Sequence, residues 1–179
     1  KEVQEKIYLP RKEGTKLLEQ FEGYFELDNV TIEKYDENDW PIRPEALKTK
    51  KAKETQINKQ ADVVMLLHLM GNEFDDETIK ENYAYYEKRT LHGSSLSPSI
   101  YSVMGLKVGD DSKAYRYLRR AAFIDLLNMQ GNTREGIHAA NTGGVWQTIV
   151  FGFAGVSQRE DGKLRVCPNM AEFNIPFTL

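Results

Sequence analysis

The sequence predicts an all-α protein with an irregular N-terminal stretch and a short β-like end. Apolar residues recur at helical spacing through residues 55–156, where we expect a helical portion. Prolines and glycines interrupt residues 1–54, which indicates loops with brief extended pieces. Leu164-Arg165-Val166 alternates like a strand, so we expect residues 157–179 to begin a small β element.

Two helices are expected before residue 90. The first spans Gln56–Met70, and because it is apolar on almost every side after Ala61, it is expected to be buried. Gly71 ends it. Asp75 can cap the second helix, which runs to about Lys88. Its buried stripe is expected at Ile79, Tyr83 and Tyr86.

Three more helices are expected between residues 97 and 153. The third has Ser97 as its N-cap and ends at Gly109, and the fourth begins at Asp110 or Asp111. The fifth opens at residues 141–144 and continues through Phe153. The buried stripe of the fourth helix is expected at Tyr115, Leu118, Ala122 and Leu126, with Arg116, Arg119 and Arg120 largely off it.

Composition excludes several classes of protein. The 179 residues are 40% hydrophobic and carry a net charge of −3, which offers no electrostatic footprint for nucleic acid or an anionic membrane. No segment reaches the ~20 apolar residues of a membrane span, and the first residues lack the apolar core of a signal peptide. The single cysteine, Cys167, fits a reducing compartment. We therefore expect a cytoplasmic protein without nucleic-acid or membrane partners.

Two helix starts combine glycines with hydroxyl-bearing residues. A helix N-terminus presents free backbone N–H groups and a partial positive charge, so it attracts anions. The first start contains His92, Gly93, Ser94 and Ser95, and the second contains Thr142, Gly143 and Gly144. Simple N-capping explains the same residues, and neither start matches the phosphate loop of nucleotide-binding proteins. From the residues alone, anion binding and capping both stay open.

The histidines and the cysteine give weaker signals. Three histidines without cysteine or carboxylate partners at ligand spacing predict no metal site. His68 lies in an apolar run and is expected in the core, whereas the sequence leaves the direction of His138 open. Cys167 is followed by Pro168 and has no nearby histidine, so we expect no nucleophilic role for it.

Four motifs in a fixed order carry a family resemblance. They are Lys59-Gln60-Ala61-Asp62-Val63, His92-Gly93-Ser94-Ser95-Leu96-Ser97, residues 131–140 (GNTREGIHAA), and Gly143-Gly144-Val145-Trp146-Gln147. Together they resemble glycoside hydrolase family 65, which holds maltose, trehalose, kojibiose and nigerose phosphorylases. The resemblance implies that the chain supplies the C-terminal part of the catalytic domain, as the later helices of an (α/α)6 barrel.

The resemblance also implies a chemistry. Inorganic phosphate attacks the anomeric carbon of an α-glucosyl unit with inversion, and the products are β-glucose 1-phosphate and a free sugar. Phosphate is then a co-substrate, a disaccharide is the other substrate, and no cofactor is implied. Lys59 and Gln60 correspond to residues that bind the glucosyl hydroxyls. The implied phosphate ligands are His92, Gly93, Ser94, Ser95, Gly143 and Gly144.

The general acid of the family has no counterpart in this chain. The general acid of the family is a glutamate upstream of the region resembled, so we expect no catalytic residue in this chain and no activity from the chain alone. The expected partners are the remainder of the full-length enzyme and a second copy in a homodimer. Two alternatives stay open: an α-glucoside hydrolase on the same barrel, and a non-catalytic interaction module. The module would use Tyr83, Tyr85, Tyr86 and Tyr101 as its contact surface.

Overall fold

A computed structural model describes residues 10–38, 40–159 and 161–169. The described chain is mostly helical, as predicted, with five helices and one two-stranded sheet. It divides into two compact units, residues 1–92 and residues 93–179. Within the described residues, no helix is both long and apolar enough to span a membrane.

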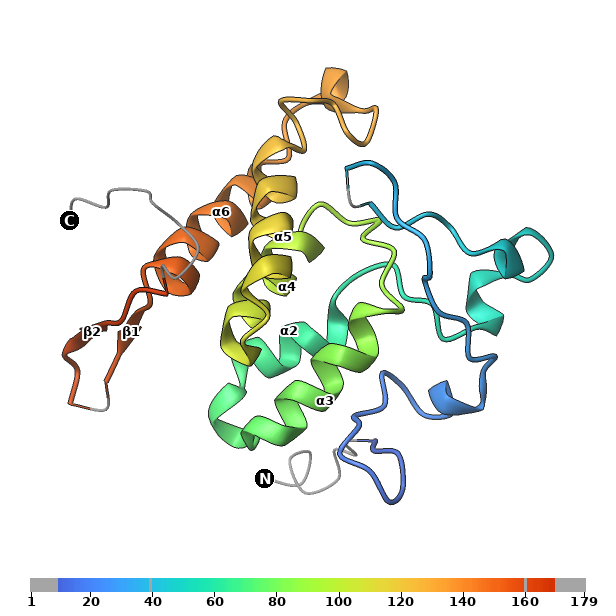
Figure 1. Ribbon diagram of the computed structural model, residues 1–179, viewed down its shortest axis with the longest axis horizontal. Coiled ribbons are helices and arrows are strands. Elements are labelled where there is room, and N and C mark those ends of the chain that lie inside the picture. The colour runs from blue at the N-terminus through green and yellow to red at the C-terminus, as the bar shows by residue number, and fades with distance from the viewer. Residues whose placement is uncertain (1–9, 39, 160, 170–179) are drawn as a thin grey trace. The chain divides into compact units, whose positions relative to one another are not determined.

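The first unit contains helices α2 (Asp62–Leu69) and α3 (Asp76–Glu87), which pack side by side (Figure 1). Asp75 caps α3 as predicted, because its side chain accepts a hydrogen bond from the Thr78 N–H. That bond, followed by one from Lys16, lowers the pKa of Asp75 to about 2. The predicted stripe of Ile79, Tyr83 and Tyr86 is buried, so this helix was predicted correctly.

The first predicted helix was placed too early. Residues 56–60 form no helix: Gln56 N donates to Asp28 O (3.0 Å) and Asn58 N donates to Arg89 O (2.7 Å), so these N–H groups pair with other segments of the chain. The helix α2 therefore begins only at Asp62. Its burial is also one-sided rather than complete, since Leu69 is 70% exposed.

Residues 10–54 have no α-helix and no extended sheet in their described part, in agreement with the predicted irregular stretch. They contain three short 3₁₀ helices, Tyr24–Glu26, Glu45–Lys48 and Ala52–Glu54, and isolated β-bridges. Side chains of α3 hold this stretch in place. Asn82 is fully buried and bonds to the backbone of Lys16 and Leu18, and the Tyr86 hydroxyl donates to Leu18 O (2.5 Å).

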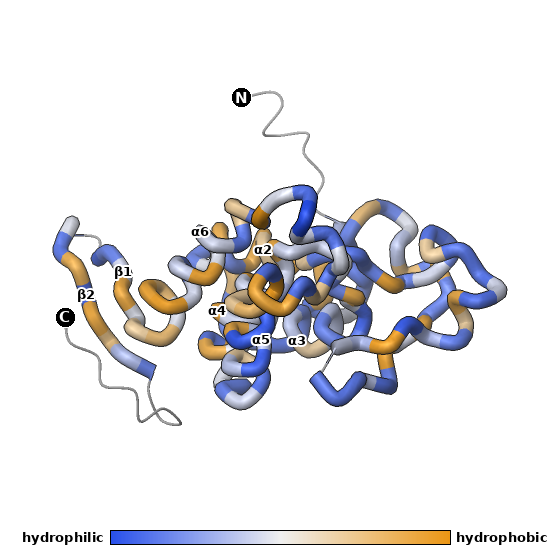
Figure 2. Tube along the Cα trace, turned by 90° about the horizontal axis from the view of Figure 1, so that it is seen from above, coloured by the Kyte–Doolittle hydropathy of each residue, from blue (hydrophilic) through white to orange (hydrophobic). Residues whose placement is uncertain are grey.

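The second unit is built on α4 (Ser97–Val108), α5 (Asp111–Phe123) and α6 (Ala139–Gln147), followed by a π-helical stretch, Thr148–Phe153. The strands β1 (Val156–Gln158) and β2 (Leu164–Val166) form an antiparallel hairpin after it (Figure 1). Gly109 ends α4 in a left-handed conformation, as predicted. Figure 2 shows hydrophobic residues along the hairpin and the turn before it, and Leu164 there is 71% exposed.

The predicted buried face of α5 is wrong by one position. The buried residues are Ala114, Tyr117 and Ala121, together with Arg120, which was expected to lie off the stripe. The alanines permit close approach to α4, where the Ser102 hydroxyl donates to Ala114 O (2.6 Å). Leu126, from the predicted stripe, is 76% exposed. The close α4–α5 contact selects small residues over the larger apolar ones.

Candidate functional site

The first unit brings together the residues predicted to bind the sugar and the predicted phosphate-binding histidine. Asn58 and Thr90 form a parallel bridge, in which Leu91 N also donates to Asn58 O (2.9 Å). Paired parallel segments run in the same direction. Lys59 and Gln60 therefore leave the bridge at the same end as His92.

The two sugar-binding candidates are exposed at the start of α2. Gln60 Nε2 donates to Asp62 Oδ1 (3.0 Å), and Gln20 Nε2 donates to the other oxygen of the same carboxylate (2.9 Å). Asp62 thus accepts hydrogen bonds from the side-chain amides of Gln60 and Gln20 and orients both. Lys59 and Gln60 present one cationic and one amide group to solvent, a combination suited to hydroxyl ligands.

His92 is the last residue of the first unit and is 1% exposed. Its backbone is left-handed, with φ at 51°, which is uncommon for a residue other than glycine. The ring of Trp40 packs on its imidazole, with 6.1 Å between ring centroids and a tilt of 43°. Sequence reasoning missed Trp40, because a tryptophan in an irregular segment belongs to no periodic pattern that could place it.

The rest of the predicted phosphate loop opens the second unit. Gly93 is exposed, and Ser94 and Ser95 are partly exposed. Ser94 O accepts a hydrogen bond from Ser97 N (3.2 Å), so the two serines form a turn that leads into α4. The helix begins at Ser97 with Leu96 at the N-cap position and no side-chain cap, so the predicted cap at Ser97 was one residue late. The Ser94 hydroxyl accepts a hydrogen bond from Leu96 N (3.4 Å), immediately before the helix.

The second predicted helix start was also misplaced. The helix α6 begins at Ala139, and His138 O accepts hydrogen bonds from Asn141 N and Thr142 N (2.9 and 3.2 Å). Gly143 and Gly144 therefore lie inside the helix rather than at its start. A Cβ atom on Gly144 would lie 2.6 Å from Ser99 Oγ of α4, so this glycine permits close packing of the two helices. Gly143 has open space around its Cα.

A carboxylate–imidazole pair lies in the second unit before α6. Asp125 accepts a hydrogen bond from the His138 backbone N–H (2.8 Å), and its other oxygen lies 2.5 Å from His138 Nδ1. The bond from the imidazole, followed by the one from the backbone, holds the pKa of Asp125 below its ordinary value. The pair fixes the ring of a histidine whose direction the sequence left open.

This pair predicts a pH dependence. A carboxylate whose pKa is lowered in the folded state adds stability above its unfolded pKa, and that stability is lost as the pH falls through the folded pKa. Asp125→Asn should therefore be less stable than the parent near neutral pH, and the difference should shrink as the pH falls below the ordinary pKa of an aspartate and through the lowered pKa of Asp125. Urea unfolding across this range measures it. A difference that stays constant with pH would contradict the assignment.

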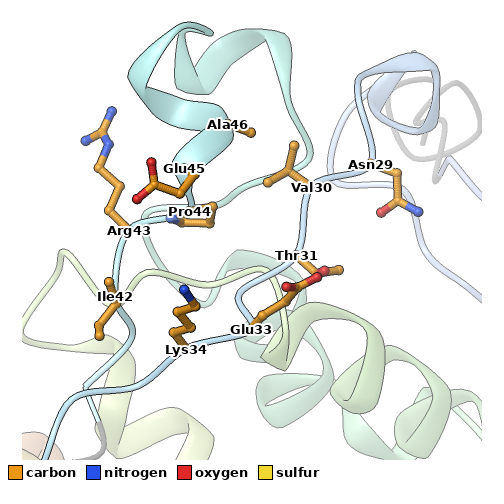
Figure 3. A pocket seen from close by; sticks show the side chains of 10 residues that line it. All are labelled: Asn29, Val30, Thr31, Glu33, Lys34, Ile42, Arg43, Pro44, Glu45 and Ala46. Carbon is orange, nitrogen blue, oxygen red and sulfur yellow. The ribbon is translucent and has the colours of Figure 1, made fainter.

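A cavity of about 380 Å³ lies elsewhere in the first unit (Figure 3). Its lining residues are Asn29, Val30, Thr31, Glu33, Lys34, Ile42, Arg43, Pro44, Glu45 and Ala46. None of the residues predicted to bind sugar or phosphate is among them. Within the described residues, no cluster of three or more His, Cys, Asp or Glu side chains is arranged to hold a metal ion.

The tyrosines of the interaction-module alternative are mostly core residues. Tyr83, Tyr86 and Tyr101 are 3%, 2% and 0% exposed. Tyr85 is half-buried, its hydroxyl donates to Gln56 Oε1, and the Arg89 guanidinium lies 3.6 Å from its ring centroid. Tyr83, Tyr85 and Tyr86 belong to the first unit and Tyr101 to the second, and three of the four are buried in the core of their own unit.

Comparison with known proteins gives a consistent result. A family model described as "Glycosyl hydrolase family 65 central catalytic domain" matches residues 1–147. A kojibiose phosphorylase from Thermoanaerobacter brockii is 55% identical over 166 residues, which are 93% of this chain and 21% of that protein. An alpha,alpha-trehalose phosphorylase from Geobacillus stearothermophilus is 48% identical over 107 residues, which are 60% of this chain and 14% of that protein.

The structural comparison agrees. A solved structure from the human microbiome, provisionally assigned as a kojibiose phosphorylase, superposes with a TM-score of 0.78 at 33% identity. The match covers 95% of this chain and 23% of that one. The chain thus spans about a fifth of the length of the curated relatives it matches.

Proposed function

The chain belongs to glycosyl hydrolase family 65, and we propose that it is part of an inverting disaccharide phosphorylase. The observation that carries this proposal is the similarity of nearly the whole chain to proteins named kojibiose phosphorylase. In the full enzyme, the five helices belong to the later part of an (α/α)6 barrel. Disaccharide and inorganic phosphate are the substrates, and the reaction uses no cofactor.

The proposed reaction replaces one bond to the anomeric carbon with another. A phosphate oxygen forms a bond to the anomeric carbon of an α-glucosyl unit, while the bond from that carbon to the glycosidic oxygen breaks. A glutamate outside this chain protonates the departing oxygen, which leaves as the hydroxyl of a free sugar. The glucosyl unit becomes β-glucose 1-phosphate, because attack from the opposite face inverts the configuration.

In this proposal, Lys59 and Gln60 bind hydroxyls of the glucosyl unit. The exposure of both side chains, and their exit from the Asn58–Thr90 bridge at the same end as His92, support that role. An ordinary inverting glycosidase places a water-activating carboxylate opposite the acid. A carboxylate would repel phosphate, whereas hydroxyl and N–H donors attract it.

The loop from His92 to Ser95 is the proposed phosphate-binding element, together with Gly143 and Gly144. The partial exposure of Ser94 and Ser95 supports the loop. His92 lies at the enclosed end of the loop. Gly143 and Gly144 lie inside α6 rather than at its N-terminus.

Phosphate dependence tests the proposal. Full-length enzyme incubated with kojibiose, trehalose or nigerose should release glucose 1-phosphate from at least one of them, and only when phosphate is present. The isolated 179-residue chain should release none, because the general acid lies outside it. If the enzyme cleaved the disaccharide equally well with and without phosphate, it would be an α-glucoside hydrolase and the proposal would be wrong.

The loop can be tested within the same assay. A hydrogen bond to a charged group contributes about 1.5–3 kcal/mol, so Ser94→Ala and Ser95→Ala should each raise the KM for phosphate by roughly 10- to 100-fold. Ser112→Ala, an exposed serine on α5, is the matched control and should leave that KM unchanged. If the KM for phosphate were unchanged in both loop variants, the loop would not bind phosphate.

A further inference from the structure

Trp40 is held by a short turn in the first unit. Asp36 N donates to Trp40 O (2.8 Å), and Asp36 Oδ1 accepts hydrogen bonds from Trp40 N (2.8 Å) and Asn38 N (2.9 Å). Ile42 N donates to Lys34 O (2.9 Å), so the residues that flank this turn on either side are also joined by a hydrogen bond. The backbone of Trp40 is therefore fixed on both its N–H and its carbonyl side.

The ring held in this way packs on an enclosed residue. His92 is 1% exposed, and its imidazole contacts the indole of Trp40 at 6.1 Å between ring centroids. His92 also adopts a left-handed backbone, a conformation that persists in a non-glycine residue only where the surrounding structure imposes it. The next residue, Gly93, is the first exposed residue of the loop.

We propose that Trp40 is a positioning residue for the His92–Ser95 loop. By packing on His92, it holds the imidazole and the left-handed turn, and so sets the direction in which the chain enters the loop. Trp40 acts through His92 and makes no contact with phosphate of its own. This inference rests on the proposed function, because it assigns Trp40 a part in phosphate recognition.

Ordinary core packing predicts a different result from positioning. A purely structural tryptophan would, when removed, lower the thermal midpoint and affect both substrates alike. A positioning residue changes the KM for phosphate more than the KM for the disaccharide. Its effect is also absent when His92 itself has already been replaced.

The experiment measures both KM values in the full-length enzyme. Trp40→Ala should raise the KM for phosphate about 10-fold or more while the KM for the disaccharide changes less than about twofold. Trp40→Phe, which keeps an aromatic ring, should retain most of the phosphate affinity. The double variant W40A/H92A should be no worse than His92→Ala alone. Tyr35→Ala, which removes an exposed ring from the same turn, is the control.

Three outcomes overturn the inference: an unchanged KM for phosphate in Trp40→Ala, an equal rise in both KM values, or additive effects of W40A and H92A. If Trp40→Ala does not fold, Trp40→Leu, which keeps apolar volume without the ring, carries the same comparison. Failure of the proposed function is distinguishable, because the parent enzyme would then cleave the disaccharide equally well without phosphate.

Discussion

Asn82→Leu is expected to lower the free energy of unfolding by about 3–5 kcal/mol. Asn82 is fully buried, and its Oδ1 accepts a hydrogen bond from Leu18 N (2.8 Å). Its Nδ2 donates to Lys16 O (2.9 Å) and to Thr78 O (2.7 Å). Leucine has a similar size but leaves the Leu18 N–H buried without a partner, which costs the desolvation of that group.

Urea unfolding of the protein measures this loss, and amide hydrogen exchange locates it. Protection should fall first at Leu18, since its N–H loses the bond directly. Asn72→Leu makes the same chemical change at an exposed position and should alter stability by less than about 0.5 kcal/mol. Equal effects of the two substitutions would show that the side-chain bonds of Asn82 do not hold residues 16–18 on α3.

Gly155→Ala is expected to destabilise the second unit by about 3 kcal/mol or more. Gly155 has a φ of 62°, and a Cβ atom there would lie 1.9 Å from the carbonyl oxygen of Cys167. That oxygen belongs to the backbone, which cannot rotate away as a side chain would. Cys167 N also donates to Gly155 O (3.1 Å), so the collision and the loss of this bond act together.

Gly162→Ala separates strain from collision. Gly162 also has a positive φ, 80°, but no atom lies within 4 Å of the position of its Cβ. This variant should therefore lose only the left-handed backbone preference, about 1 kcal/mol. Thermal unfolding of both variants, with hydrogen exchange across residues 156–166, tests the pair. If Gly155→Ala were as stable as Gly162→Ala, the close approach of Cys167 would not occur in solution.

Three helix ends governed by local chemistry were predicted correctly. Asp75 accepts from Thr78 N and Asp110 accepts from Lys113 N, each within three residues along the chain. Gly109 ends α4 because its left-handed conformation needs no partner from elsewhere. Such signals involve only neighbouring residues, so the sequence displays them in full.

Contacts between distant segments decided what was predicted wrongly. The non-helical backbone at Gln56 and Asn58 depends on hydrogen bonds to Asp28 and Arg89, each about thirty residues away along the chain. The buried face of α5 depends on how closely α4 approaches Ala114 and Ala121. The local pattern of apolar residues does not show either of these distant contacts. Predictions from that pattern alone therefore gave the wrong start for α2 and the wrong buried face for α5.

By itself, the sequence determined the mostly helical class, the Asp75 and Asp110 caps, the end of α4 at Gly109 and the motifs that identify the family, because each depends on residues that are neighbours along the chain. Only the tertiary structure decided the surroundings of the candidate residues. It placed Trp40 against His92, put Lys59 and Gln60 at the same end of a parallel bridge as that histidine, and moved Gly143 and Gly144 into the body of α6. The first two are consequences of packing between segments far apart in the chain, which local propensity does not encode.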